Sequence, residues 1–233
     1  MKIMSFNTQH CLNYIEQKID FQIMADAIKK CEADIVGLNE MRNKGIEEEF
    51  TDQVATLSKL TGMEHHYFAK ALDVRGANPY GNGFLSKYPI VSAETIAIPD
   101  PEPRTYNGYY ETRCLLKAKL EGGITVLVSH FGLNPDEQKN AVDTVVKNLA
   151  SEKCILMGDF NVRPDNKVLD PIRVRMKDTA DLFDKELFSH PSDAPNVKID
   201  YIFVSPDVEV VSADIPAIVA SDHRPHTATV NFK

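Results

Sequence analysis

Ile155-Leu-Met-Gly-Asp-Phe-Asn161 is a short apolar run that ends in a carboxylate and a carboxamide. The run predicts a buried strand, and Arg163-Pro164 directly after it stops that strand. Asp159 and Asn161 are two residues apart, so they share one face where the strand meets a loop. The pair offers a charge and a neutral hydrogen-bonding group, which is a suitable arrangement for chemistry. The alternative is that Asp159 only caps a turn.

A strand that ends in a polar residue also occurs near the N-terminus. Residues 2–7, 20–32 and 34–40 predict a strand, an amphipathic helix and a buried strand. A strand–helix–strand unit of this length makes its two strands parallel, with both carboxyl ends at one edge of the sheet. We therefore expect Asn7 and Glu40, which end the two strands, to be neighbours.

The central stretch completes a second copy of this unit. Residues 123–130 predict a strand, 135–150 a helix and 154–159 the strand described above. Here His130 and Asp159 end the strands. Open sheets bind ligands at the carboxyl ends of parallel strands, so we expect the polar residues of both copies to face one cleft.

The remaining segments predict many strands and few helices. At 233 residues the chain is within the reach of one sheet-rich domain, and we expect a single domain over 1–233. So many strands favour an α/β (α+β) fold with two mixed sheets packed face to face and helices outside, a four-layered α/β/β/α sandwich. A single doubly wound sheet is the alternative. The further predicted elements are a helix at 50–61, strands at 64–72, 82–88, 90–98, 112–120, 198–204, 208–211 and 227–232, and a helical and looped stretch at 165–188.

Composition limits the partners. The net charge is −8 and no basic run occurs, which argues against tight binding to nucleic acid or to an anionic membrane surface. The four cysteines lack the spacing of a zinc site or a disulfide framework, which fits reduced thiols in the cytosol. The N-terminus becomes polar too early for a signal peptide, and no apolar run approaches the length of a membrane span. We expect a cytoplasmic protein; its oligomeric state is left open.

A second polar set comes from the C-terminal third. Asp200 lies inside an apolar strand, where a lone carboxylate is costly unless a partner meets it. Ser221-Asp222-His223 precedes the last strand. If Asp200 accepts a hydrogen bond from His223, that cost is offset, and the imidazole gains a fixed tautomer and a raised pKa. The alternative is that Asp200 is a satisfied acid of the core.

These motifs, in this order, resemble the endonuclease/exonuclease/phosphatase superfamily over the whole chain. That superfamily includes exonuclease III-type and deoxyribonuclease I-like nucleases, neutral sphingomyelinases, inositol polyphosphate 5-phosphatases and poly(A) deadenylases. Its fold is a deoxyribonuclease I-like four-layered sandwich, in agreement with the strand count. The matching motifs are Met4-Ser-Phe-Asn7, Gly37-Leu-Asn-Glu40, Gly81-Asn-Gly-Phe-Leu-Ser-Lys-Tyr-Pro-Ile90, Ser129-His130, Gly158-Asp-Phe-Asn161, Ile199-Asp200-Tyr and Ser221-Asp222-His223.

The resemblance implies a Mg²⁺-dependent phosphoester hydrolase, with Mn²⁺ as a possible substitute. Glu40 would be the chief metal ligand, and Asn7 and Asp222 would complete the shell. These are hard oxygen donors, which suit Mg²⁺ better than zinc.

The resemblance also implies roles in catalysis. Asp159 and Asn161 would position and deprotonate the attacking water, while His130 and His223 would bind phosphate oxygens. The general base is either Asp159 or the His223–Asp200 pair, and the pair is slightly favoured because its pKa is better matched to neutral pH.

Two residues outside the strand ends are further candidates for binding substrate. Arg113, at the head of a strand, is expected to bind phosphate or to be an exposed strand-end arginine. Asn82, in the hairpin beside the cleft, is expected to contact substrate.

Three readings of the function stay open. The first is a phosphodiesterase or phosphatase acting on a small or lipid-derived phosphoester. The second is an exonuclease III-type nuclease acting on DNA or RNA, which the net charge, His130 and the absence of basic aromatic loops disfavour. The third is a catalytically inactive binding module of the same fold. Two departures from the family pattern bear on them: Asn39 replaces the usual Gln, and Gln9 stands where several repair nucleases carry an acid.

Overall fold

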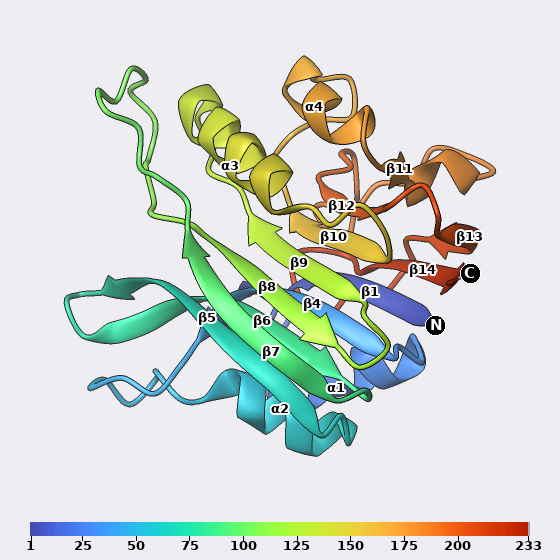
Figure 1. Ribbon diagram of the computed structural model, residues 1–233. Coiled ribbons are helices and arrows are strands. Elements are labelled where there is room, and N and C mark those ends of the chain that lie inside the picture. Colours follow the sequence, from blue (N-terminus) through green and yellow to red (C-terminus); the bar gives the residue numbers. More distant parts are fainter. Residues whose placement is uncertain (233) are drawn as a thin grey trace.

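Two six-stranded sheets pack face to face in the computed structural model, which describes residues 1–232 (Figure 1). Both sheets are mixed. In the first, β1 and β4 are parallel neighbours and the other pairs are antiparallel. Its strand order is β13 (Glu209–Asp214), β14 (His226–Asn231), β1 (Lys2–Asn7), β4 (Ile35–Arg42), β6 (Asn78–Ser86) and β5 (His65–Val74).

The second sheet repeats this plan around β9 and β10, which are again parallel neighbours between antiparallel ones. Each parallel pair is joined by a crossover helix, as expected from the two strand–helix–strand units. The strand order is β11 (Lys177–Asp178), β12 (Asp200–Val204), β10 (Cys154–Asp159), β9 (Thr125–His130), β8 (Cys114–Leu120) and β7 (Ile90–Ala97).

Helices cover the outer face of each sheet. Alternation along β9 separates the layers: Val126 and Val128 face the core between the sheets, and Leu127 faces the helices. The helices are α1 (Phe21–Lys30) and α2 (Gln53–Thr61), packed on the first sheet, and α3 (Pro135–Asn148) and α4 (Asp170–Arg173), packed on the second. Short 3-10 helices are η1 (Gln9–Cys11), η2 (Lys167–Leu169) and η3 (Thr179–Leu182). The expected four-layered α/β/β/α sandwich is thus confirmed.

Three parts of the chain differ from the sequence-based expectation. The strands expected at 64–72 and 82–88 reach further into the connection between them, because β5 extends to Val74 and β6 begins at Asn78. The N-terminal polar loop contains a small hairpin, and the 165–188 stretch contains β11. These pairs are too short to leave a periodic signal. The hairpin consists of β2 (Leu12–Asn13) and β3 (Lys18–Ile19).

Within residues 1–232 no helix is long and apolar enough to cross a membrane. All four cysteines are buried and free.

Candidate active site

Polar side chains from both sheets meet at the edge where the parallel strands end. Asp159, the last residue of β10, is in register with His130 on β9 and with Asp200 on β12. β12 runs antiparallel to β10, so it begins at the edge where β9 and β10 finish. From the first sheet, Asn7 donates from Nδ2 to Glu40 Oε1 and to Asp159 Oδ2, both at 3.0 Å. The structure therefore brings the two predicted polar sets together through Asn7.

A close approach of β9 and β10 positions Asp159. Gly158 has φ +146°, and a Cβ there would lie 1.8 Å from the carbonyl oxygen of Ser129. Asn39 supports the same strand end from the other sheet: its Oδ1 accepts from the backbone N–H of Asp159 at 2.9 Å, and its Nδ2 donates to the Ser129 carbonyl. The Asn that replaces the usual Gln thus links the two sheets behind the site.

Asp159 is the centre of the cluster and is 2% exposed. Its Oδ1 accepts from the backbone N–H of Asn161 at 2.9 Å. Its Oδ2 lies 3.5 Å from His130 Nε2 and 3.6 Å from His223 Nε2. Burial raises the pKa of Asp159 to about 7, with the charge of His223 opposing the shift and that of Asp200 adding to it.

His223 and Asp200 form the expected pair. His223 Nδ1 lies 2.8 Å from Asp200 Oδ2, and both side chains are buried. Burial lowers the pKa of His223, but the charges of Asp200 and Asp159 outweigh that effect and raise it to about 10. The imidazole is therefore flanked by two carboxylates and carries a positive charge at neutral pH.

His130 has the opposite electrostatic character. Arg113 donates from a guanidinium nitrogen to its Nδ1 at 2.9 Å, which leaves the ring proton on Nε2, the atom that faces Asp159. Burial, together with the charges of Arg113 and His223, holds the pKa of His130 well below its usual value. Asn161 Nδ2 donates to the Phe131 carbonyl and lies 3.1 Å from Nε2; in this tautomer both nitrogens carry hydrogen, so the second contact is not a hydrogen bond. Asp159 thus lies between a neutral imidazole, that of His130, and a charged imidazole, that of His223.

Arg113 is enclosed at the head of β8. Its side chain is 11% exposed and pairs with Glu111 at 2.6 Å. This is not the exposed strand-end arginine that the sequence left as an alternative. Glu111, which sequence reasoning did not single out, holds the guanidinium beside His130.

Asn82 lies behind the site and does not face it. It is 2% exposed, its Oδ1 accepts from Asn39, and its Nδ2 donates to the Cys114 carbonyl. Because both ends of its amide are occupied inside the protein, the structure gives Asn82 a supporting place and not the expected substrate contact.

The expected metal ligands Glu40 and Asn7 meet on β4 and β1, with the amide nitrogen of Asn7 turned to the Glu40 carboxylate. Glu40 adopts a left-handed backbone conformation, φ +61°, which is uncommon for a residue with a side chain. Burial, with the charge of Asp222 adding to it, raises the pKa of Glu40. A carboxylate enclosed next to another acid gains from a cation, and Mg²⁺ prefers such carboxylate and carbonyl oxygens.

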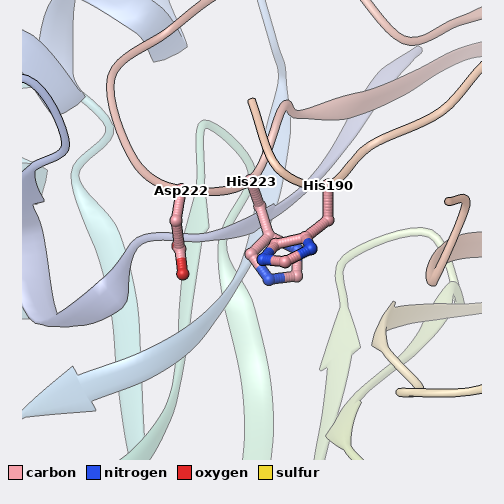
Figure 2. Close-up of side chains that lie close together, drawn as sticks. All are labelled: His190, Asp222 and His223. Carbon is pink, nitrogen blue, oxygen red and sulfur yellow. The ribbon is translucent and has the colours of Figure 1, made fainter. Parts of the chain in front are cut away.

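Asp222 also belongs to a second group, of which sequence reasoning missed only His190. Potential ligand atoms of His190, Asp222 and His223 all lie within 4.8 Å of one another. Figure 2 shows the His190 ring beside that of His223, with a centroid distance of 4.7 Å. His190 lies in the long loop before β12, where no periodicity signals a side chain's position; only its residue type could have marked it.

Two packed mixed sheets with helices outside match the deoxyribonuclease I-like fold of the structural neighbours. The model of the endonuclease/exonuclease/phosphatase family matches residues 4–223, so this chain belongs to that family. Its members are generally hydrolases that act on phosphoester bonds, and they typically depend on divalent metal ions.

Solved structures share the fold at low sequence identity. A family protein from Beutenbergia cavernae is 20% identical with a TM-score of 0.78, and the match covers 100% of this chain and 71% of that one. The mannosyl-6-phosphatase of Bacteroides thetaiotaomicron is 16% identical with a TM-score of 0.77, and both chains are covered completely. The human Nocturnin catalytic domain is 15% identical with a TM-score of 0.65, covering 100% of this chain and 94% of that one. No curated protein matches the sequence.

Proposed function

We propose that this protein is a metal-dependent phosphoester hydrolase that acts on a small or lipid-derived phosphoester. One observation carries the proposal: Asp159 Oδ2 lies within 3.6 Å of both His130 Nε2 and His223 Nε2, next to the carboxylate of Glu40. This arrangement supplies a base, anion-binding groups and a metal ligand around one point.

Glu40 would hold the metal ion, with Asn7 and Asp222 beside it as further oxygen donors. When bound, Mg²⁺ or Mn²⁺ supplies positive charge that holds a phosphate oxygen and offsets the charge that develops during attack. In the structure Asn7 presents Nδ2 to Glu40 while its Oδ1 accepts from the backbone N–H of Gln9, so its amide would have to leave both contacts to offer Oδ1 to a cation and otherwise holds the Glu40 carboxylate in place.

Asp159 is the proposed general base. It would take a proton from a water molecule that the Asn161 amide orients, while the water oxygen attacks phosphorus and the leaving group departs with its bonding electrons. The sequence slightly favoured the His223–Asp200 pair. We prefer Asp159 because His223 lies 2.8 Å from one carboxylate and 3.6 Å from another, and both favour an imidazolium, which accepts no proton.

His223 and His130 would bind the non-bridging phosphate oxygens. Asp200 acts through His223 and is therefore a positioning residue. His130 offers a neutral Nε2–H donor whose tautomer is fixed by Arg113. The guanidinium of Arg113 would add positive charge beside the phosphate. Because this group is largely shielded from water, its electrostatic attraction to the phosphate would be stronger than that of an exposed arginine.

The net charge of the protein favours a small or lipid-derived substrate over nucleic acid. A nuclease needs a basic track along the phosphate backbone, and the net charge of −8 without a basic run disfavours it. The structural neighbours include a mannosyl-6-phosphatase, which supports screening small phosphoesters first.

The experiment is ³¹P NMR of wild-type protein with Mg²⁺ and a panel of sugar phosphates, lipid phosphodiesters and nucleotides. Metal-dependent conversion of a sugar or lipid phosphoester is the expected result. Binding to duplex DNA that is tight at low salt and weakens as salt rises would favour the nuclease instead. Full metal binding without turnover of any substrate would favour an inactive binding module.

A further inference from the structure

One cavity of the described chain lies apart from the catalytic residues. It has a volume of about 800 Å³ and is formed by the loop after β10, α4, η3 and the segment that leads into β12. Of the adjacent elements, α4 packs on the second sheet and β11 is the edge strand of that sheet (Figure 1). None of Glu40, His130, Asp159, Asp200 or His223 lines it. Pockets of this size are typical of sites for small organic molecules.

Lys198, two residues before Asp200, lines this cavity and is 5% exposed. Its Nζ has no hydrogen-bond acceptor within residues 1–232. Asp178 forms an ion pair with Lys198, but its Oδ2 lies 3.7 Å from Nζ, beyond hydrogen-bond distance, and its Oδ1 accepts from the backbone N–H of Ala180. The ring of Tyr201 lies beneath the ammonium, with its centroid 3.4 Å from Nζ. A buried ammonium that keeps its donors free is costly unless an acceptor meets it.

Burial also affects the charge of this group. It lowers the pKa of Lys198 to about 8, while Asp178 and Asp200 oppose the shift. The amine is therefore still mostly protonated at neutral pH. An anionic acceptor in the cavity would stabilise the charged form further.

The other walls limit what kind of anion fits. Met176, Phe183 and Phe188 supply apolar surface. The remaining charges nearly balance, so they do not favour a ligand with several negative charges: the cations are Arg163, Arg173 and Lys185, and the acids are Asp165, Asp178, Asp181 and Glu186. A single acceptor group on an apolar body matches this combination.

We propose that this cavity is a second ligand site, which binds a small monoanionic organic molecule with its carboxylate or sulfonate at Lys198 and its apolar part against Phe183 and Phe188. The site is independent of the proposed hydrolase function, because its ligand contacts none of the catalytic residues. The competing account is that ordered water alone satisfies Lys198, in which case no organic anion binds specifically.

The test is a fluorescence titration with 8-anilinonaphthalene-1-sulfonate, followed by displacement with hexanoate. Wild-type protein should show one saturable site that hexanoate empties. Lys198→Met keeps the apolar stem but removes the ammonium, and the affinity for the probe should fall by roughly tenfold or more. The matched control is Lys185→Met, which removes a cation at the same cavity and should change the affinity less than twofold.

A second variant keeps the result decisive if Lys198→Met fails to fold. Ala180→Trp fills the cavity from η3 without altering Lys198, and it too should abolish saturable binding. Folding of each variant is checked by circular dichroism and thermal unfolding. The proposal is overturned if wild type shows no saturable binding up to millimolar probe, or if folded Lys198→Met and Ala180→Trp bind as tightly as wild type. Hydrolase activity does not enter the readout, so failure here leaves the proposed function untouched.

Discussion

The Nδ1 atom of His223 lies 2.8 Å from the Oδ2 atom of Asp200, and both side chains are buried at the start of β12. This contact fixes the ring so that Nε2 faces Asp159 at 3.6 Å. The contact therefore determines both the orientation and the charge of the group proposed to bind phosphate.

Asp200→Asn should lower kcat by roughly 10²–10⁴ while the protein stays folded, because a neutral amide no longer holds the imidazole in its charged form. Steady-state kinetics with Mg²⁺ measure the effect. Asp214→Asn, at an exposed position on β13, is the matched control and should retain wild-type turnover. A kcat for Asp200→Asn within tenfold of wild type would remove Asp200 from the mechanism.

The pH profile should follow the two charged groups. Asp159 must be ionised to act as a base, so activity should fall as pH drops through its pKa of about 7. His223 must stay protonated to bind phosphate, so activity should fall again as pH rises through about 10. A broad plateau between these values is expected in kcat/KM. In Asp200→Asn the alkaline limb should move to lower pH; an unchanged limb would contradict the assignment of that limb to His223.

Glu40→Gln should weaken binding of the metal ion without disturbing the fold. Loss of one charged ligand should reduce the apparent Mg²⁺ affinity by at least about tenfold, a change of about 1.4 kcal/mol or more. Titration of activity with Mg²⁺ after EDTA treatment measures it, and excess Mg²⁺ should restore part of the rate. Glu48→Gln, an exposed acid, serves as the control. Equal Mg²⁺ affinity in wild type and Glu40→Gln would show that the ion binds elsewhere.

Gly158→Ala should destabilise the protein strongly, because the backbone has φ +146° and the new Cβ would collide with the Ser129 carbonyl oxygen. We expect a loss of roughly 3 kcal/mol or more in the free energy of unfolding. Gly76→Ala provides the comparison: its φ is +88° but it faces open space, so the cost should be only about 1–2 kcal/mol. Urea unfolding measures both. Similar losses in the two variants would mean that β9 and β10 separate easily at this point.

The fold and much of the site could be predicted because local sequence patterns indicate the strands, the helices and the residues at which the strands end. The two strand–helix–strand units fixed the parallel pairs, which place Asn7 beside Glu40 and Asp159 beside His130. Asp200 and His223 could be paired because a carboxylate inside an apolar strand demands a partner.

The residues that were missed depend on tertiary contacts without a local signal. His190 reaches His223 from a long loop, and Asn39 acts across the gap between the sheets. Asn82 was expected to face the cleft because it lies in a hairpin beside it. The amide is instead buried between Asn39 and Cys114, a position that only the packing of β6 against the second sheet determines.

The central claim is that Asp159 and a divalent metal ion together hydrolyse a phosphoester, and the most direct test is cleavage of bis-p-nitrophenyl phosphate and p-nitrophenyl phosphate. Wild type and Asp159→Asn are assayed with Mg²⁺, Mn²⁺ or EDTA, with Asp165→Asn, an exposed acid, as the control. We predict cleavage of at least one compound by wild type and the control with Mg²⁺ or Mn²⁺, abolished by EDTA and reduced by roughly 10²–10⁴ in Asp159→Asn. Cleavage that persists in EDTA, or a folded Asp159→Asn with wild-type turnover, would contradict the account.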